Sequence, residues 1–331
     1  MFFPQAIHKL VLTHPPQISI VIPLYNEAQV LPHLLERLLK LLNNSDLLIE
    51  VVLVDDGSAD GTAMIAQQIA LTDTRFQFIS LARNYGQQIA LSAGLKAFNA
   101  TEAIMIMDGD IQDPPEMLTE FYAQLQKGYD VVYAVRENRK EAFIKRWAYV
   151  IFYRMLKSIS YINIPLDSGD FSMFTRKVAD IINKMPEESR FIRGMRTWVG
   201  LNQIGISYNR EERAAGTSKY TLKKLFKLAY NGIFNFSEFP VKLITNLGLI
   251  TISCSLIYFA YNVYKKLVLH AVPEGFTALL FTIILFSGVQ LLSLGIIGEY
   301  VLRIFFQVKG RPLFIVKKRI INQEISNNSD L

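Results

Sequence analysis

Two long apolar runs near the C-terminus constrain this chain more than any other feature. Residues 243–264 and 275–298 contain no Asp, Glu, Lys or Arg, and each is long enough to cross the core of a bilayer as a helix. One such run could be the core helix of a soluble protein, but two in tandem predict a hairpin of two membrane-spanning helices. The apolar fraction of 51% is above the usual range for a soluble domain.

Basic residues flank the two runs and predict their orientation. They are Lys219, Lys223, Lys224, Lys227 and Lys242 before the first run, and Arg303, Lys309, Arg311, Lys317, Lys318 and Arg319 after the second. The loop between the runs holds only Lys265 and Lys266, opposed by Glu274. The positive-inside rule therefore places both flanks in the cytoplasm. Anionic lipid and phosphorylated substrates explain the net charge of +6, and no basic groove with interleaved aromatic residues indicates a nucleic acid partner.

Short apolar runs alternate with helical patterns along the first part of the chain. The runs expected to be strands are 18–22, 50–54, 76–81, 104–107 and 131–135. Helical patterns follow each of the first four, the last of them over 115–127. Strands that alternate with helices predict βαβ units, an α/β fold and a mostly parallel sheet. The single cysteine, Cys254, lies in the first apolar run, so no disulfide can form within one chain.

An acidic stretch follows the fourth expected strand, where residues 104–116 read IMIMDGDIQDPPE. Asp108 and Asp110 are two residues apart in an extended segment, so their side chains point the same way. Gly109 between them lets the backbone approach a ligand closely. Hard oxygen donors in this arrangement suit Mg²⁺ or Mn²⁺, which bind one or two carboxylates together with substrate phosphates. The alternative is an acidic turn that caps the helix after Pro114.

Polar residues also follow other expected strands, which favours the functional interpretation. They are Asn26 and Glu27, Asp55 and Asp56, and Arg136. In parallel α/β sheets, ligands bind outside the carboxyl ends of the strands. No G-x-G-x-x-G follows the first strand and no G-x-x-x-x-G-K-[ST] occurs, so neither a Rossmann dinucleotide site nor a P-loop is expected.

The ordered set of motifs resembles family 2 glycosyltransferases with the GT-A fold. The motifs are IVIPLYNE at 20–27, VVLVDDGSADGT at 51–62, LARNYGQQIALSAGL at 81–95, DIQDPPE at 110–116, SGDF at 168–171, RAAGTSKY at 213–220 and GVQLLSLGIIGEYVLRIFFQVKGRPLF at 288–314. Within that family the set is most similar to polyprenyl-phosphate glycosyltransferases, the group of dolichyl-phosphate mannose synthase and bacterial undecaprenyl-phosphate glucosyltransferases. The resemblance covers about residues 18 to 316.

The resemblance implies a membrane-anchored, inverting glycosyltransferase of cell-envelope glycan synthesis that depends on Mg²⁺ or Mn²⁺. It would move a hexose, expected to be glucose, from a UDP-sugar to undecaprenyl phosphate at the cytoplasmic leaflet of the inner membrane. The expected partners are the nucleotide sugar, the polyprenyl phosphate, the bilayer and further copies of the chain, in a homo-oligomer such as a tetramer.

Two alternatives stay open. One is a processive polysaccharide synthase, although such enzymes usually carry Q-x-x-R-W and more spans, where this chain has Arg196-Thr197-Trp198. The other is a catalytically inactive membrane scaffold that binds sugar nucleotides.

The resemblance also implies roles for individual residues. Nucleotide-sugar binding is expected of Pro23, Tyr25, Asn26, Glu27, Asp55, Asp56, Arg83, Asp108 and Gln112; metal binding of Asp108, Asp110 and Gln112; catalysis of Asp110, Asp170, Arg213 and Lys219; and acceptor-phosphate binding of Arg136, Lys145 and Arg146. For Glu27 and Asp56 the alternative is capping of the following helices. Asp170 is either a general base or an orienting group, because a phosphate monoester, with a second pKa of about 6, is already largely ionised at neutral pH.

The expected organisation has five parts. A lead-in, 1–17, precedes the GT-A catalytic domain, 18–220; a juxtamembrane interface helix, 221–239, leads to two transmembrane helices within 240–303; and a cytoplasmic tail, 304–331, ends the chain. The residues after Asp170 read FSMF and are strand-like. Glu299 and Arg303 are one helical turn apart and are expected to pair at the cytoplasmic edge of the second span.

Overall fold

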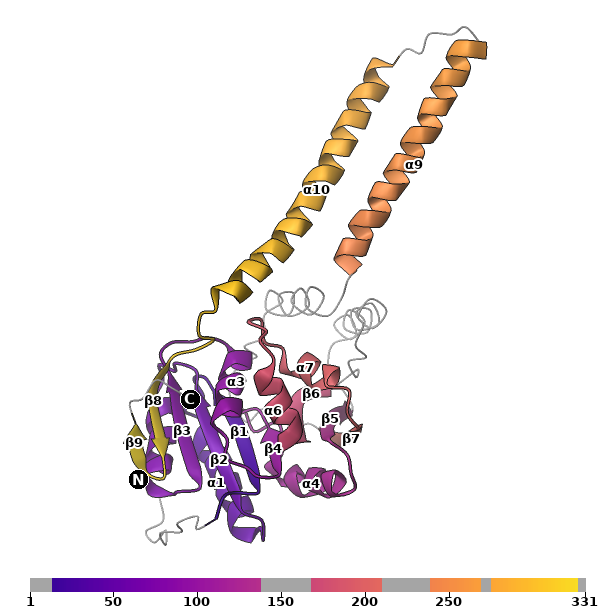
Figure 1. Ribbon diagram of the computed structural model, residues 1–331. Coiled ribbons are helices and arrows are strands. Elements are labelled where there is room, and N and C mark those ends of the chain that lie inside the picture. Colours follow the sequence, from indigo (N-terminus) through magenta and orange to yellow (C-terminus); the bar gives the residue numbers. More distant parts are fainter. Residues whose placement is uncertain (1–13, 138–167, 210–238, 269–274, 327–331) are drawn as a thin grey trace. The chain divides into compact units, whose positions relative to one another are not determined.

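The computed structural model describes residues 14–137, 168–209, 239–268 and 275–326 (Figure 1). The chain divides into two compact units. One unit contains a single large sheet with its helices, and it includes the C-terminal residues from Pro312 onward. The other contains two long apolar helices.

The first unit is built on a nine-stranded sheet with the strand order β7-β5-β6-β4-β1-β2-β3-β8-β9. The strands are β1 (Ile18–Leu24), β2 (Ile49–Asp55), β3 (Phe76–Leu81), β4 (Ala103–Ile106), β5 (Val131–Glu137), β6 (Ser168–Thr175), β7 (Gln203–Asn209), β8 (Val316–Ile321) and β9 (Glu324–Ser326). Strands β1 to β4 are parallel, and β5 is parallel to β7. Strand β6 runs antiparallel between β4 and β5. The mostly parallel α/β sheet expected for a GT-A fold is confirmed, and the five expected strands begin and end within two residues of those observed.

Helices follow the strands and cover the sheet. They are α1 (Leu31–Asn44), α2 (Thr62–Thr72), α3 (Gln87–Ala97), the 3₁₀ helix η1 (Pro115–Met117), α4 (Leu118–Gln126), α6 (Arg176–Lys184) and α7 (Ile192–Trp198). Helix α1 shows why they form: five leucines that recur with the period of a helix are buried on one face, namely Leu31, Leu34, Leu35, Leu38 and Leu42. They pack with β1 and β2 in one hydrophobic core.

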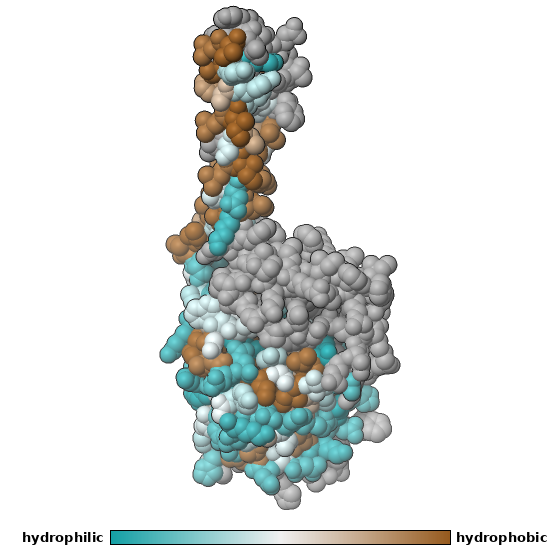
Figure 2. Space-filling model, turned by 90° about the vertical axis from the view of Figure 1, so that its right-hand side faces the viewer, coloured by the Kyte–Doolittle hydropathy of each residue, from teal (hydrophilic) through white to brown (hydrophobic). Residues whose placement is uncertain are grey.

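The two apolar helices are α9 (Phe239–Val268) and α10 (Phe276–Lys309). Candidate spans run over 240–265 and 285–309, with mean hydropathies of 1.8 and 1.6, and neither window is buried in the protein. Figure 2 shows apolar side chains along these helices. The expected pairing of Glu299 with Arg303 on α10 is confirmed, because Arg303 Nε donates a hydrogen bond of 2.9 Å to Glu299 Oε1.

The segment after α10 adds strands to the sheet, whereas the sequence had suggested only a tail there. Strand β8 pairs antiparallel with β3, and Ile320 lies opposite Phe78 in the core (Figure 1). Lys318 Nζ donates a hydrogen bond of 2.9 Å to Gln67 Oε1 on α2. The hydrogen-bonding edge of β3 is thereby covered. Because β7 precedes α9 and β8 follows α10, the chain leaves this sheet and comes back to it.

Candidate active site

The loops after β1 and β2 are joined by hydrogen bonds. The Asn26 N–H donates to Ser58 Oγ at 2.9 Å, and Asn26 Oδ1 accepts from the Ala59 N–H at 2.9 Å. The Glu27 N–H donates to Thr62 Oγ1 at 2.8 Å. Asn26 has a φ of 52°, a left-handed conformation that asparagine tolerates better than most residues. These contacts hold the end of β1 against the end of β2.

Asp56 anchors the loop that leads from β3 into α3. Its side chain is only 2% exposed, and its two oxygens accept hydrogen bonds from the backbone N–H groups of Tyr85 and Gly86 at 2.7 and 2.8 Å. Burial raises the pKa of Asp56 above its ordinary value, although these two hydrogen bonds act in the opposite direction. Asp56 makes no bond to the start of α2, where Asp60 Oδ1 accepts from the Thr62 N–H at 3.1 Å. Asp56 holds the start of α3 instead, because Gly86 is the N-cap residue of that helix.

Gly57 allows this loop to pack closely on the end of β2. Its φ is 70°, and a Cβ atom there would lie 2.7 Å from the backbone carbon of Arg83. The Arg83 guanidinium in turn lies 4.0 Å above the ring of Tyr85. Asp55, next to Asp56, accepts from the Ser58 N–H and from Ser80 Oγ, each at 3.2 Å.

The acidic motif forms a strained turn after β4. Asp110 is 7% exposed, and its Oδ1 accepts from the Gln112 N–H at 3.2 Å. Ile111 has a φ of 63°, which is an outlier for a β-branched residue and is typical of functional sites. A Cβ on Gly109 would lie 2.8 Å from Leu24 Cδ2, so the close approach that Gly109 permits is to the end of β1.

Two consecutive glutamines at the start of α3 each hold a carboxylate. Gln87 Nε2 donates to Asp108 Oδ1 at 2.7 Å, and Gln88 Nε2 donates to Asp170 Oδ2 at 2.8 Å. Gln88 Oε1 also accepts from the Ile192 N–H, the first residue of α7, at 2.8 Å. The antiparallel ladder of β4 and β6 ends at the pair Ile106 and Ser172, two residues before Asp108 and two residues after Asp170. Sequence reasoning gave neither glutamine a role.

Two arginines of α7 lie near Asp170. Arg193 Nε is 3.7 Å from Asp170 Oδ1. Arg196 is 1% exposed, and its guanidinium lies 5.2 Å from the ring centre of Tyr133. Its Nε and Nη2 atoms have no hydrogen-bond partner among the residues that the structure describes. Burial lowers the pKa of Arg196 to about 10, with a further lowering by Arg193 and an opposing effect of Asp170. The sequence analysis had used Arg196 only to argue against a processive synthase.

Arg136, at the end of β5, lies next to the acidic motif. Burial lowers the pKa of this guanidinium, but Tyr208, Asp113 and Asp108 outweigh it and the net effect is a raised pKa. The Tyr208 hydroxyl donates to Asp113 Oδ1 at 2.7 Å. A Cβ on Gly169 would lie 3.3 Å from Arg136 Nη2, so the glycine before Asp170 makes room for the arginine. Tyr208 and Asp113 had not been predicted as site residues.

The predicted site residues that the structure describes lie at one edge of the sheet. They lie in the last residues of the parallel strands or in the loops just after them: at β1 (Pro23, Tyr25, Asn26, Glu27), β2 (Asp55, Asp56), β3 (Arg83), β4 (Asp108, Asp110, Gln112) and β5 (Arg136). Asp170 lies at the amino end of antiparallel β6. Lys145, Arg146, Arg213 and Lys219 lie outside the described residues, as do the expected helix at 221–238 and the RAAGTSK loop.

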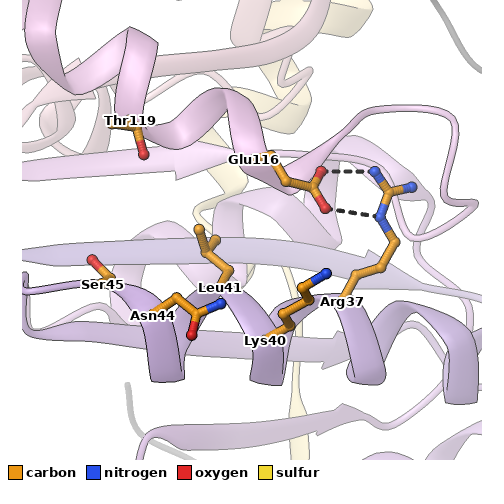
Figure 3. Close-up of a pocket in the computed structure, with 7 residues that line it drawn as sticks. All are labelled: Arg37, Lys40, Leu41, Asn44, Ser45, Glu116 and Thr119. Atoms are coloured by element: carbon orange, nitrogen blue, oxygen red, sulfur yellow. Dashed lines mark hydrogen bonds and ion pairs between the residues drawn. The ribbon is translucent and has the colours of Figure 1, made fainter.

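A separate hollow of 280 Å³ lies between α1 and the start of α4 (Figure 3). It is lined by Arg37, Lys40, Leu41, Asn44, Ser45, Glu116 and Thr119. Arg37 donates two hydrogen bonds to the Glu116 carboxylate, of 2.7 and 3.1 Å. This pair ties the end of the acidic motif to α1, and the hollow contains none of the carboxylates that gather at the sheet edge.

The carboxylates offer a partial metal site. Among the described residues, no three His, Cys, Asp or Glu side chains gather in the way a protein-only metal site requires. Asp108 and Asp110 nevertheless provide hard oxygen donors from one loop, and Mg²⁺ and Mn²⁺ commonly complete their coordination with substrate phosphates and water. The donor set therefore fits a divalent ion that binds together with a phosphorylated ligand.

Comparison with known proteins is consistent with this arrangement. The family described as Glycosyl transferase family 2 matches residues 19–182. The uncharacterized glycosyltransferase YkcC of Bacillus subtilis is 41% identical over 91% of this chain and 94% of its own length. The bactoprenol glucosyl transferase of Shigella phage SfII is 36% identical over 91% of this chain and 98% of its own length.

Among solved structures, a glucosyl-3-phosphoglycerate synthase of Mycobacterium tuberculosis in complex with Mn²⁺ and UDP covers 66% of this chain and 77% of its own, with a TM-score of 0.46 and 17% identity. That likeness is too distant to indicate a ligand for this chain. The relatives in sequence are much closer and extend over nearly the whole chain. Because these relatives are 36% and 41% identical over 91% of its length, the chain belongs to the family 2 glycosyltransferases and is a glycosyltransferase.

Proposed function

We propose that this enzyme transfers a hexose, in the first place glucose, from a UDP-sugar to a polyprenyl phosphate at the cytoplasmic face of a membrane, with inversion. The observation that carries the proposal is the pair of carboxylates Asp108, after β4, and Asp170, at the start of β6, which the consecutive glutamines Gln87 and Gln88 hold. The names of the bactoprenol glucosyl transferases among the relatives support the acceptor. The two long apolar helices support a substrate that resides in lipid.

In the proposed reaction an oxygen of the acceptor phosphate attacks the anomeric carbon of the sugar. The bond between that carbon and the diphosphate oxygen breaks, and UDP leaves with the electron pair. Asp108 and Asp110, assisted by Gln112, would hold a Mg²⁺ or Mn²⁺ ion, which would supply charge neutralisation for the leaving diphosphate. Asn26, Glu27 and the loop held by Asp56 would form the binding site of the nucleoside.

Asp170 serves in this proposal to orient the acceptor. Its neighbours are Gln88, Arg193 and the buried Arg196, an environment that favours a fixed anion next to cationic side chains. The charge of Arg136 interacts with those of Asp113 and Asp108 in the acidic motif, so its proposed contact with phosphate would occur near that motif. Arg213 and Lys219 keep their expected role at the diphosphate.

The connectivity supports a hairpin of membrane helices. Strands β7 and β8 belong to one sheet, and α9 and α10 lie between them in the chain. A chain that crosses a membrane and returns to the same folded unit crosses it an even number of times. The basic residues on both flanks favour the cytoplasm as the side on which the sheet lies.

The test uses the purified protein in detergent with Mn²⁺, undecaprenyl phosphate and a panel of sugar nucleotides, and mass spectrometry identifies the sugar-lipid. We expect a single hexosyl product from UDP-glucose, which is lost with EDTA and in Asp110→Asn while the melting temperature of the variant is retained. Absence of product with every donor, in a folded protein that still binds UDP, would favour the inactive scaffold. A product that carries several sugar units in one chain would favour the processive synthase.

A further inference from the structure

We infer that Gln87 and Gln88 are positioning residues with separate duties: Gln87 orients Asp108 for the metal, and Gln88 orients Asp170 for the acceptor. The inference rests on the proposed function for its acceptor half. Neither glutamine needs to touch a substrate in this account, because each acts through the carboxylate that it holds.

The start of α3 forms a bracket between two strands. Consecutive residues of a helix point about 100° apart, so adjacent side chains can reach two different strands. Gln87 reaches the end of β4 and Gln88 the beginning of β6, over sequence separations of 21 and 82 residues. The backbone just before them is fixed, because the N–H groups of Tyr85 and Gly86 donate to Asp56. The bracket is therefore anchored to β2 while it holds β4 and β6.

Both amides have defined orientations. Gln88 donates through Nε2 to Asp170 and accepts through Oε1 from the Ile192 N–H, so a flip of the amide would lose both bonds. Gln87 donates to Asp108 at 2.7 Å. A hydrogen bond to one oxygen of Asp108 and to one oxygen of Asp170 fixes the orientation of each carboxylate group. Outer-shell partners of metal ligands act in the same way.

The chemistry of Gln88 offers a variant that separates its two bonds. In Gln88→Glu an oxygen can still accept from the Ile192 N–H, whereas the donor to Asp170 is replaced by a second negative charge. A role limited to holding α7 therefore predicts that glutamate is tolerated. Positioning of Asp170 predicts a loss of turnover of roughly tenfold or more, with an unchanged melting temperature and an affinity for Mn²⁺ within about twofold of that of the parent protein.

For Gln87 the matching variant is Gln87→Leu, which removes the donor to Asp108 and leaves an apolar side chain that is one atom shorter. We expect the affinity for Mn²⁺ in the presence of UDP, read from the electron paramagnetic resonance signal of free Mn²⁺, to fall roughly tenfold. The control is Gln68→Glu, an exposed glutamine of α2, which should change neither readout.

The outcomes are distinguishable. If Gln87→Leu binds Mn²⁺ normally, or if Gln88→Glu turns over normally, that half of the inference is wrong. If both variants lower both readouts together with the melting temperature, α3 is a structural element only, and the separate duties are refuted. The Mn²⁺ titration needs no turnover. A parent protein that makes no sugar-lipid would therefore overturn the proposed function and the Gln88 half, while the Gln87 half is still decided.

Discussion

At the scale of single residues, the most costly feature of the site is the guanidinium of Arg196. It is fully buried, and two of its nitrogens have no hydrogen-bond partner within the described parts of the chain. Asp170, the carboxylate that acts on it electrostatically, already has Arg193 and Gln88 as neighbours. A buried charge without close compensation destabilises a fold. Such conflicts between local physics and stability are expected mainly at functional sites. The role that Arg196 can serve is to place a positive charge near Asp170.

Arg196→Met should therefore stabilise the protein and impair catalysis. Burial lowers the pKa of Arg196 to about 10, and the shift corresponds to roughly 3 kcal/mol against the charged form in the folded state. For a base with a depressed folded pKa, this penalty is present at every pH below the folded value and is relieved only as the pH rises from there toward the unfolded value. At neutral pH the methionine variant avoids it.

The measurement is a thermal melt in detergent at neutral pH together with the sugar-lipid assay. We expect the melting temperature of Arg196→Met to rise by a few degrees and the turnover to fall, because the cation next to Asp170 is lost. Arg196→Lys keeps a buried charge and should show no such rise. A lower melting temperature for the methionine variant would mean that the guanidinium makes a net stabilising contribution to packing.

At the scale of elements, the sequence predicts what depends on short stretches of chain. Strands such as β2, with seven buried residues in a row, and helices such as α1, with its leucine face, are encoded locally. Strand β8 was not predicted, because VKKRII reads as a basic tail and becomes a strand only beside β3. The edge of the sheet that carries the site follows from strand order. The hydrogen bonds of Gln87 and Gln88 could not be predicted in this way, because the sequence does not indicate which distant carboxylate a glutamine amide will bind.

The packing of one loop on another gives the second prediction, on Gly57→Ala. Alanine there needs a φ of 70° and places its Cβ 2.7 Å from the backbone of Arg83. The loop that precedes α3 must move, and with it the bracket formed by Gln87 and Gln88. We expect a loss of roughly 1–3 kcal/mol in the free energy of unfolding, and a clear fall in Mn²⁺ affinity and turnover.

Gly128→Ala is the matched control for this substitution. Gly128 also has a positive φ, of 96°, but nothing lies within 4 Å of the position of its added Cβ. Its variant should show only the cost of the backbone conformation, about 1 kcal/mol, with normal Mn²⁺ binding. Equal losses in the two variants would show that the loop contact at Gly57 contributes nothing beyond backbone strain.

At the scale of the whole molecule, one sheet contains strands from both sides of the apolar helices in the sequence. Strands β1 to β7 come before the apolar helices, and β8 and β9 come after them, yet all nine strands are in one sheet. Arg319 on β8 lies close enough to the buried Glu50 of β2 for the two charges to interact, and Gln323 Nε2 donates to the backbone oxygen of Thr72 at the end of α2. The parts of the chain that flank the helices are therefore built into one folded unit.

This architecture predicts a topology that is testable in a bacterial membrane. Green fluorescent protein fused at either end of the chain should fluoresce, because both flanks then lie in the cytoplasm. Alkaline phosphatase inserted between residues 269 and 274, the segment that joins α9 to α10 in the chain, should be active, because it would lie on the outer side. The flanking lysines and arginines decide between this orientation and its inverse, whereas the shared sheet requires only that both ends lie on one side. A phosphatase that is active at the C-terminus but not at the N-terminus would contradict the pairing of β8 with β3. Phosphatase activity at both ends would leave that pairing intact and overturn only the cytoplasmic placement.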